Sequence, residues 1–262
     1  MMSLALLALI WFPHVGAGAE VSHDLGVDPD LRGQIRVEFI AEVLTSETLT
    51  LELNTEMKSY VRENHDNETL FRVSPQQVHY PVGATLRFQL DERHAWALVA
   101  RHQSNHDVDT NDAVLNRETI SFEVYGAQLL GDGYALEAGL YYDRGTRAGG
   151  RKQYWPFDYY LGGLRAQAEW PRVGSWYAHL DATVILHRNS ATTPPHANLG
   201  GHLDAGWRFS GQRGQFRMFA RGTRITDYQQ LGDRPHHMIM LGVSVKSSSA
   251  AYRPGAGPIS KY

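Results

Sequence analysis

The sequence predicts an all-β fold, a closed antiparallel transmembrane β-barrel of 10 to 12 strands. Two observations lead to this prediction. Segments of about ten residues alternate apolar and polar side chains, and the turns that separate these segments are alternately short and long. Because successive side chains of a strand point to opposite faces of a sheet, each segment forms a strand with one apolar and one polar face.

The alternation is clearest over residues 175–187. The apolar face there carries Trp176, Ala178, Leu180, Ala182, Val184 and Leu186, and the polar face carries Ser175, Tyr177, His179, Asp181, Thr183 and His187. The same pattern predicts strands at 47–62, 82–90, 94–104, 117–130, 134–143, 157–170, 175–188, 198–210, 215–229 and 236–247. In the strand 117–130, we expect Ile120, Phe122 and Val124 to lie on the apolar face.

The polar faces of these segments decide which way the sheet is turned. They carry large charges of both signs, namely Arg87, Arg101, Glu123, Glu137, Arg165, Glu169, Asp181, Asp204, Arg208, Arg217 and Arg221. Charges of both signs can form salt bridges with one another inside a barrel, so the polar face is expected to line the lumen. The apolar face is then turned outward to lipid. The alternative is a soluble β-sandwich or lipocalin-like barrel, whose apolar face would point inward.

The lengths of the turns and the positions of the aromatic residues indicate that the barrel spans a membrane. Short turns at 91–93, 131–133, 171–174 and 210–214 alternate with longer polar loops, which is the layout of bacterial outer-membrane barrels with the short turns on the periplasmic side. Four tryptophans lie near the short turns, as an interfacial belt requires: Trp96, Trp170, Trp176 and Trp207. We therefore predict a bacterial outer-membrane location and contact with the barrel-assembly machinery during biogenesis.

The predicted organisation has four parts. Residues 1–19 resemble a secretory signal peptide, with an apolar run from Leu4 to Phe12 and a small-residue cleavage site at Ala17-Gly18-Ala19. Residues 20–46 form an N-terminal segment in which 33–43 are either an extra strand or a periplasmic segment. Residues 47–247 form the transmembrane barrel, and the Pro- and Gly-containing tail 248–262 is predicted to be disordered.

Composition excludes several classes of function. The formal net charge is -3, which gives no support to nucleic-acid binding. The sequence contains no cysteine, so disulfide frameworks, cysteine-ligated zinc and thiol nucleophiles are excluded.

One polar segment, residues 101–112, contains a candidate catalytic set. Extending the alternation of Trp96, Leu98 and Ala100 places His102 and Ser104 on the lipid-facing side, and Glu118 shares the parity expected for the lipid face of the next strand. A serine hydroxyl becomes a nucleophile when a base removes its proton and an acid orients that base. The spacing therefore indicates ester hydrolysis at the depth where lipid ester bonds lie.

The sequence here resembles the outer-membrane lipid A 3-O-deacylases, whose barrels carry a His-x-Ser-Asn motif followed further along by a glutamate. His102-Gln103-Ser104-Asn105 matches the motif and Glu118 the acid. The resemblance implies Ser104 as nucleophile, His102 as general base, Glu118 as the orienting acid and Asn105 as part of the oxyanion hole. The family has smaller barrels and small residues after its Asn, where this chain has His106 and Asp107. The segment also resembles larger uncharacterised outer-membrane barrels, for which no activity is implied.

Calcium binding is an alternative use of the same segment. Asp107, Asp109, Asn111 and Glu118 stand at positions 1, 3, 5 and 12 of a calcium-loop pattern, with Asp112 where the pattern has glycine. Five other histidines near the long loops are expected at the surface and not as metal ligands: His65, His187, His196, His236 and His237.

Three functions fit this reading of the sequence. The chain is an esterase that removes an acyl chain from lipopolysaccharide (at its lipid A) or from phospholipid, or a structural or loop-display barrel, or a narrow channel. Wide aqueous channels need about sixteen strands or more, so the channel is the weakest of the three. No cofactor other than calcium is indicated.

Overall fold

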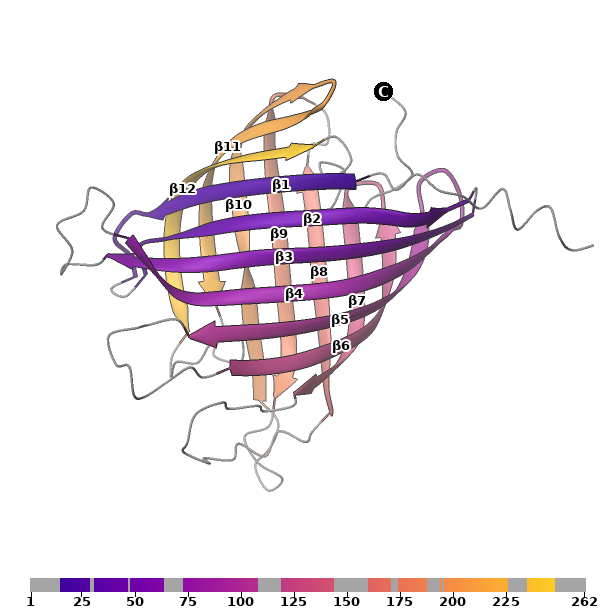
Figure 1. The fold of residues 1–262 in the computed structure, drawn as a ribbon, viewed down its shortest axis with the longest axis horizontal. Helices are drawn as coiled ribbons and strands as arrows, with labels where there is room; N and C mark the ends of the chain where they lie inside the picture. Colours follow the sequence, from indigo (N-terminus) through magenta and orange to yellow (C-terminus); the bar gives the residue numbers. More distant parts are fainter. Residues whose placement is uncertain are drawn as a thin grey trace, which may run out of the picture.

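The chain forms one closed antiparallel β-barrel (Figure 1). The computed structural model describes residues 15–28, 31–46, 48–63, 73–107, 119–143, 160–170, 174–187, 194, 196–225 and 235–247. The strands are β1 (Val15–Asp24), β2 (Gly33–Thr45), β3 (Leu49–Glu63), β4 (Val73–Gln89), β5 (Ala95–Asp107), β6 (Thr119–Gly131), β7 (Tyr134–Asp143), β8 (Tyr160–Trp170), β9 (Trp176–His187), β10 (His196–Gly211), β11 (Gly214–Ile225) and β12 (His236–Ser247). Within these ranges, no helix is long and apolar enough to cross a membrane.

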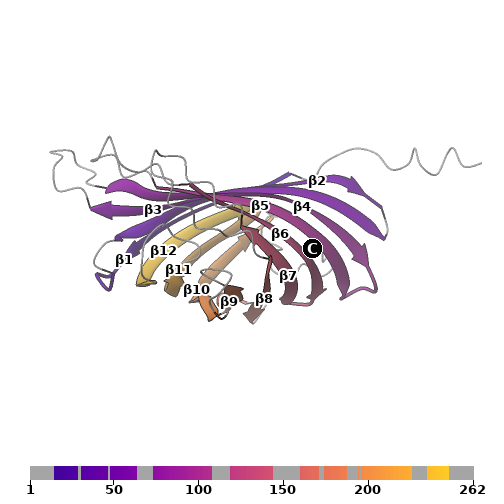
Figure 2. The same ribbon diagram turned by 90° about the horizontal axis from the view of Figure 1, so that it is seen from below.

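Each strand pairs with its neighbours in the sequence, and β1 closes the barrel against β12. Figure 1 shows β1 to β5 crossing β8 to β10 at a steep angle, as the tilted strands of a barrel do. Figure 2 shows β3 and β4 on the side of the barrel opposite β9 and β10. The predicted fold class is therefore confirmed, with twelve strands at the upper end of the expected range.

The connections between strands differ in length at the two rims. One rim has the short connections at 46–48, 90–94, 132–133, 171–175 and 212–213, and the other has those at 25–32, 64–72, 108–118, 144–159, 188–195 and 226–235. Because β1 begins and β12 ends at the short-turn rim, both ends of the barrel sequence lie there. Short periplasmic turns are the rule in outer-membrane barrels.

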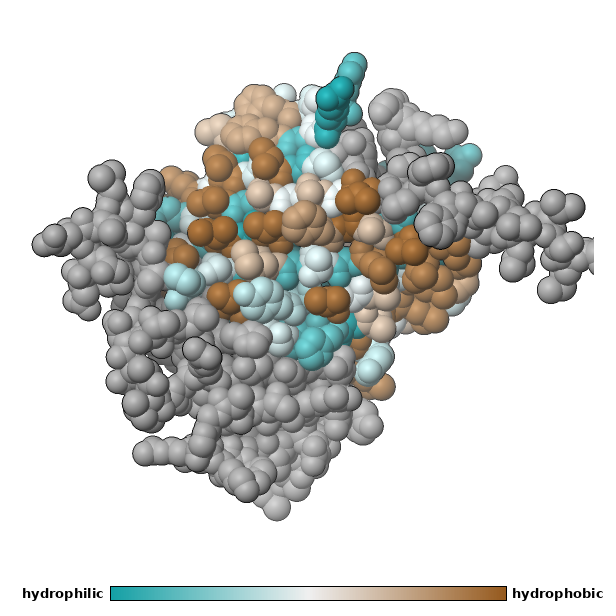
Figure 3. Space-filling view, viewed as in Figure 1, coloured by the Kyte–Doolittle hydropathy of each residue, from teal (hydrophilic) through white to brown (hydrophobic). Residues whose placement is uncertain are grey.

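The barrel wall is apolar outside and polar inside, as the alternation predicts. Large apolar side chains such as Leu164, Leu136 and Ile239 are 64%, 48% and 49% exposed. Acidic side chains such as Glu137 and Asp204 are buried. Figure 3 shows apolar residues spread over the outer wall. Such an inverted arrangement suits a hydrocarbon solvent and not water.

Aromatic side chains gather on the outer wall beside the short turns. Trp170 and Trp176 flank the β8–β9 connection, with ring centroids 5.1 Å apart in an edge-to-face arrangement. Phe88 stacks on Trp96 at 4.2 Å beside the β4–β5 connection. Rings at this level form the interfacial belt predicted from the sequence.

The lumen is crossed by ion pairs, several of which join strands that are not neighbours. Arg221 of β11 binds both Asp204 of β10 and Glu20 of β1, the latter across the intervening β12. Glu169 of β8 binds Arg208 and Arg217. Arg101 pairs with Glu137 at 2.9 Å, and Arg165 with Asp181 at 2.5 Å. Ten of the predicted lumen charges take part in ion pairs, namely Arg87, Arg101, Glu137, Arg165, Glu169, Asp181, Asp204, Arg208, Arg217 and Arg221.

The N-terminal region supplies the two strands beyond the ten expected. Residues 33–43, predicted to be either an extra strand or a periplasmic segment, lie within β2, and its partner β1 covers residues 15–24. Val15 to Ala19 thus belong to the barrel wall, although the signal-peptide pattern places them before its cleavage site. The signal peptide and the disordered tail stay predictions, and residues 1–14 and 248–262 lie outside the described residues.

One expected surface histidine is buried. His236 begins β12 and is 7% exposed, with its Nδ1 atom 2.8 Å from Oδ2 of Asp28 in the β1–β2 connection. The expectation of a surface residue is wrong here because Asp28, buried as well, provides a charged partner at the loop end of the lumen.

Candidate lipid-side active site

Strand β5 brings His102 and Ser104 to the outer wall near the long-loop rim. Trp96, Leu98 and Ala100 precede them on the exposed face of this strand, while Ala95, Ala97 and Val99 are buried. The pairing of β5 with β4 and β6 has no register shift, so the alternation continues unbroken. His102 is exposed and Ser104 half-exposed, as predicted for a site facing lipid.

The facing of β6 is opposite to the prediction. Val124 is fully buried, whereas Tyr125 and Leu129 are 55% and 43% exposed. The expectation that Ile120, Phe122 and Val124 face lipid is therefore wrong for Val124, and the regular register gives positions 120 and 122 the same lumen-facing parity. The physical reason is that apolar residues stand at both even and odd positions of β6, so the alternation alone does not decide which set faces outward. Hydrogen bonding to β5 and β7 decides it.

This reversal brings a different glutamate to the site. In the pairing of β5 with β6, His102 stands opposite Glu123, and Ser104 stands opposite Ser121. On the β4 side, Ser104 stands opposite Tyr80. Position 123 shares the parity of the exposed Tyr125, so it belongs to the outer face and not to the lumen, where Glu123 was predicted. The side chain of Glu123 lies outside the described ones.

The backbone register fixes how far apart these positions are. Directly opposite residues of an antiparallel pair have Cβ atoms about 4.5–5.5 Å apart, and residues two apart on a strand share a face. His102 is therefore next to Ser104 along the strand and next to position 123 across it. A histidine between a serine and a carboxylate has the order that a catalytic triad needs.

The other predicted site residues are not brought together by the described backbone. Glu118, Asp109 and Asn111 lie outside the described residues. Asn105 and Asp107 are the end of β5 with undescribed side chains, and their odd positions have the lumen-facing parity of Ala97 and Val99. The proposed oxyanion role of Asn105 and the calcium site of Asp107, Asp109 and Asn111 thus stay predictions.

An apolar groove lies on the outer wall immediately below this pair. It has a volume of about 690 Å³ and is lined by Leu51, Ala84, Leu86, Leu98, Val99, Ala100, Tyr125, Gly126, Ala127, Ala138, Gly139 and Leu140. Ala100 and Tyr125 are opposite each other, one step along the face from His102 and position 123. The groove forms because four of its lining residues are alanines, with larger side chains on either side. These alanines are Ala84, Ala100, Ala127 and Ala138.

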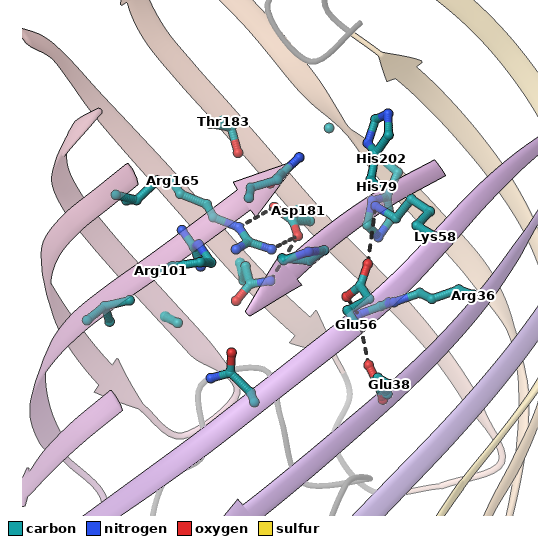
Figure 4. A pocket seen from close by; sticks show the side chains of 18 of the residues that line it. Arg36, Glu38, Glu56, Lys58, His79, Arg101, Arg165, Asp181, Thr183 and His202 are labelled. Carbon is teal, nitrogen blue, oxygen red and sulfur yellow. Dashed lines mark hydrogen bonds and ion pairs between the residues drawn. The ribbon is translucent and has the colours of Figure 1, made fainter. Parts of the chain in front are cut away.

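The lumen holds a second, polar cavity of about 330 Å³. Figure 4 shows charged side chains that enter it from opposite walls, with dashed lines between Arg165 and Asp181 and around Glu56. Arg36 pairs there with Glu38 and Glu56 at 2.8 and 2.7 Å. Ion pairs from both walls therefore line this chamber.

The sequence does not predict two features of the structure. Glu123 is predicted to face the lumen because the first half of its strand indicates the opposite face. His179 lies on a predicted polar face, but its proximity to His202 depends on the β9–β10 register, which pairs Asp181 with His202 and His179 with Asp204. A local spacing rule for metal ligands does not detect such a cross-strand set.

Comparison with known proteins shows similarity of fold. No protein-family model matches the sequence, and no curated protein matches it. Outer membrane phospholipase A from Escherichia coli has a TM-score of 0.50 at 12% identity, over 89% of this chain and 97% of that one.

Two further solved structures are similar. The outer membrane phospholipase of Salmonella typhi, a dimer with bound calcium, has a TM-score of 0.49 at 12% identity over 90% and 92% of the two chains. The β domain of the Bordetella autotransporter BrkA has a TM-score of 0.44 at 12% identity over 89% and 97%. The closed twelve-strand barrel and the similarity to the Escherichia coli structure show an all-β fold of the kind found in outer-membrane barrels.

Proposed function

We propose that this protein is an outer-membrane esterase that removes an acyl chain from a lipid, either lipid A or a phospholipid, at the outer leaflet. The observation that carries the proposal is the position of Ser104 and His102 on the outer face of β5, above an apolar groove. Polar residues on a lipid-facing wall are costly, and inside membranes they mark functional sites. Lipopolysaccharide and phospholipid are the partners this site would meet.

The reaction follows from the chemistry of the three positions. His102 takes the proton of the Ser104 hydroxyl as Ser104 attacks the ester carbonyl, and then gives it to the departing alcohol oxygen. Water hydrolyses the resulting acyl-serine by the same proton path, releasing a fatty acid and restoring Ser104. Loss of water from the groove would strengthen each electrostatic contact.

For the orienting acid, we propose Glu123 in place of Glu118. Its register position opposite His102 supports this choice, because a carboxylate that accepts a hydrogen bond from one ring nitrogen leaves the other free to act as base. The register argues against the oxyanion role of Asn105, because position 105 has the opposite parity from Ser104.

The groove supports a lipid as the substrate. Its apolar lining lies on the hydrocarbon-facing wall, where a lipid acyl chain could enter sideways without crossing water. A barrel of similar fold is a phospholipase, so the architecture accommodates lipid hydrolysis. Non-enzymatic loop display is the alternative if no lipid is altered.

Mass spectrometry of lipid A and phospholipids from cells expressing the protein tests the proposal. Wild type should produce deacylated lipid, and Ser104→Ala should reduce it by a factor of about 10³ or more. The matched control is Ser210→Ala, an exposed serine at the short-turn rim, which should leave the product unchanged. An identical lipid profile for wild type and Ser104→Ala would exclude the enzyme.

The same assay identifies the acid and the role of calcium. We expect Glu123→Gln to lower the rate by a factor of about 10² to 10⁴, because the histidine loses its orienting partner. Glu118→Gln should have a small effect. If Glu118→Gln abolishes activity and Glu123→Gln does not, Glu118 is the orienting acid, as first predicted. If the wild-type rate requires calcium and the rate of Glu118→Gln does not, Glu118 belongs to a calcium site, as the calcium-loop pattern predicts.

A further inference from the structure

A histidine pair and an aspartate meet on the lumen wall, away from the proposed active site. His202 and Asp204 are two residues apart on β10, so they share a face, and His179 of β9 stands directly opposite Asp204. One donor atom from each lies within 4.8 Å of the others. The two imidazole rings have centroids 5.3 Å apart. Three groups of metal-ligand type therefore converge from two adjacent strands.

We propose that His179, His202 and Asp204 bind a divalent first-row transition metal of the Zn²⁺ class. Zinc accepts imidazole nitrogen and carboxylate oxygen at about 2.0–2.2 Å, in a tetrahedral arrangement that water can complete. Two imidazoles in three ligands favour zinc, copper or nickel over calcium and magnesium, which take oxygen ligands.

Hydrogen bonding in the structure does not satisfy the ring of His179. Its Nδ1 atom lies 3.8 Å from Oδ2 of Asp204, which is beyond hydrogen-bond distance. Its Nε2 atom is buried and has no hydrogen-bond partner among the described residues. A buried polar atom without a partner costs free energy. Coordination of a cation by this ring would offset that cost.

The surrounding charges favour a cation. Arg221 binds Asp204 through Nε at 2.6 Å and also binds Glu20, so one guanidinium faces two carboxylates. The negative charge of Asp181, which stands opposite His202, is balanced by its ion pair with Arg165. One negative charge therefore remains beside two imidazoles. Arg221 also fixes the orientation of the Asp204 carboxylate, in the manner of the outer-shell groups that orient metal ligands.

The lumen cavity gives access to the site. His179 and His202 both line it, together with Asp181 and Thr183, and Figure 4 shows His202, Asp181 and Thr183 among the lining side chains. A metal ion can therefore reach the two rings from water in the lumen, and the chamber has room for a water molecule as the fourth ligand. The site is separate from Ser104, which lies on the outer face of the wall.

Zinc titration of the purified full-length barrel in detergent, made metal-free and without a polyhistidine tag, tests the proposal. We expect one equivalent of Zn²⁺ to bind in competition with a chromophoric chelator, and Co²⁺ to give the absorption bands of a tetrahedral site. His202→Ala and His179→Ala should each weaken binding at least tenfold. The exposed His237 on β12 provides the matched control, and His237→Ala should bind like wild type.

Folding is checked separately, by the heat-dependent gel mobility of each variant. The midpoint of thermal unfolding should rise with zinc concentration in wild type and His237→Ala only, because a ligand stabilises the state that binds it. Absence of saturable zinc binding to the folded wild type would overturn the proposal, and so would equal affinity in folded His202→Ala.

Discussion

Arg221 is the residue whose loss should destabilise the barrel most clearly. Its side chain is 5% exposed and links β11 to β10 and, through Glu20, to β1. Arg221→Met would leave Asp204 and Glu20 buried without their common cation. Removing one partner of a buried ion pair costs about 3–5 kcal/mol, and we expect a loss of this size in urea titrations followed by tryptophan fluorescence.

The matched control for this prediction is Arg213→Met, since Arg213 is exposed in the β10–β11 turn. Its free energy of unfolding should stay within about 0.5 kcal/mol of wild type, as for other surface substitutions. Equal stability of wild type and Arg221→Met would mean that the lumen ion pairs do not hold the barrel together.

The sequence predicts the facing of single residues well in β5 and poorly in β6. The large apolar residues of β5, Trp96 and Leu98, stand at positions of the same parity, so the alternation places His102 and Ser104 on the outer face, where the structure has them. In β6, apolar residues occupy both parities, and the outward face is that of Tyr125 and not that of Val124. The first half of β6 therefore predicts the wrong face, and with it the wrong acid for the proposed site.

Whole strands were predicted where apolar side chains are large and regularly spaced, as in β7 and β12, whose observed bounds match the expected ones. Strands of small or polar composition were missed or shortened. β4 begins at Val73, inside a stretch predicted as loop, because residues 73–80 are mostly polar. β1 was missed because its glycines and alanines resemble a cleavage site as much as a strand.

The reversed face of β6 can be tested directly because the chain contains no cysteine. We expect spin labels on single cysteines at positions 123, 125 and 127 to collide frequently with oxygen, which concentrates in the bilayer. Labels at 122 and 124 should collide rarely, since Val124 is buried against the lumen. The measurement is power-saturation electron paramagnetic resonance in lipid vesicles.

Labels at positions 96 and 98 of β5 serve as the lipid-facing reference, because Trp96 and Leu98 are exposed. High oxygen accessibility at 122 and 124 with low accessibility at 123 would restore the facing first predicted for β6. Glu123 would then be assigned to the lumen again, and Glu118 would again be the acid predicted to share a face with His102.

At the scale of the whole molecule, closure depends on the first strand. β1 pairs with β12 from Gly18 to Asp24 and with β2 from Val15 to His23, and Glu20 joins Arg221 across the seam. The general architecture was predictable because it repeats one pattern around the barrel. The seam was not, because pairing between strands at opposite ends of the chain leaves no local signal in the sequence.

The position of the mature N-terminus follows from this closure. A transmembrane β-strand needs about 9–11 residues, and β1 has 10. Cleavage after Ala19 would leave only Glu20 to Asp24 of the strand and would remove the pairs of Gly18 with Lys246 and of Ala19 with Val245. We therefore expect intact-mass measurement of the protein extracted from membranes to give an N-terminus at or before Val15. A mature chain that begins at Glu20 would mean that the barrel closes with a shortened β1, held mainly by Glu20 and the pairs from Val21 to Asp24.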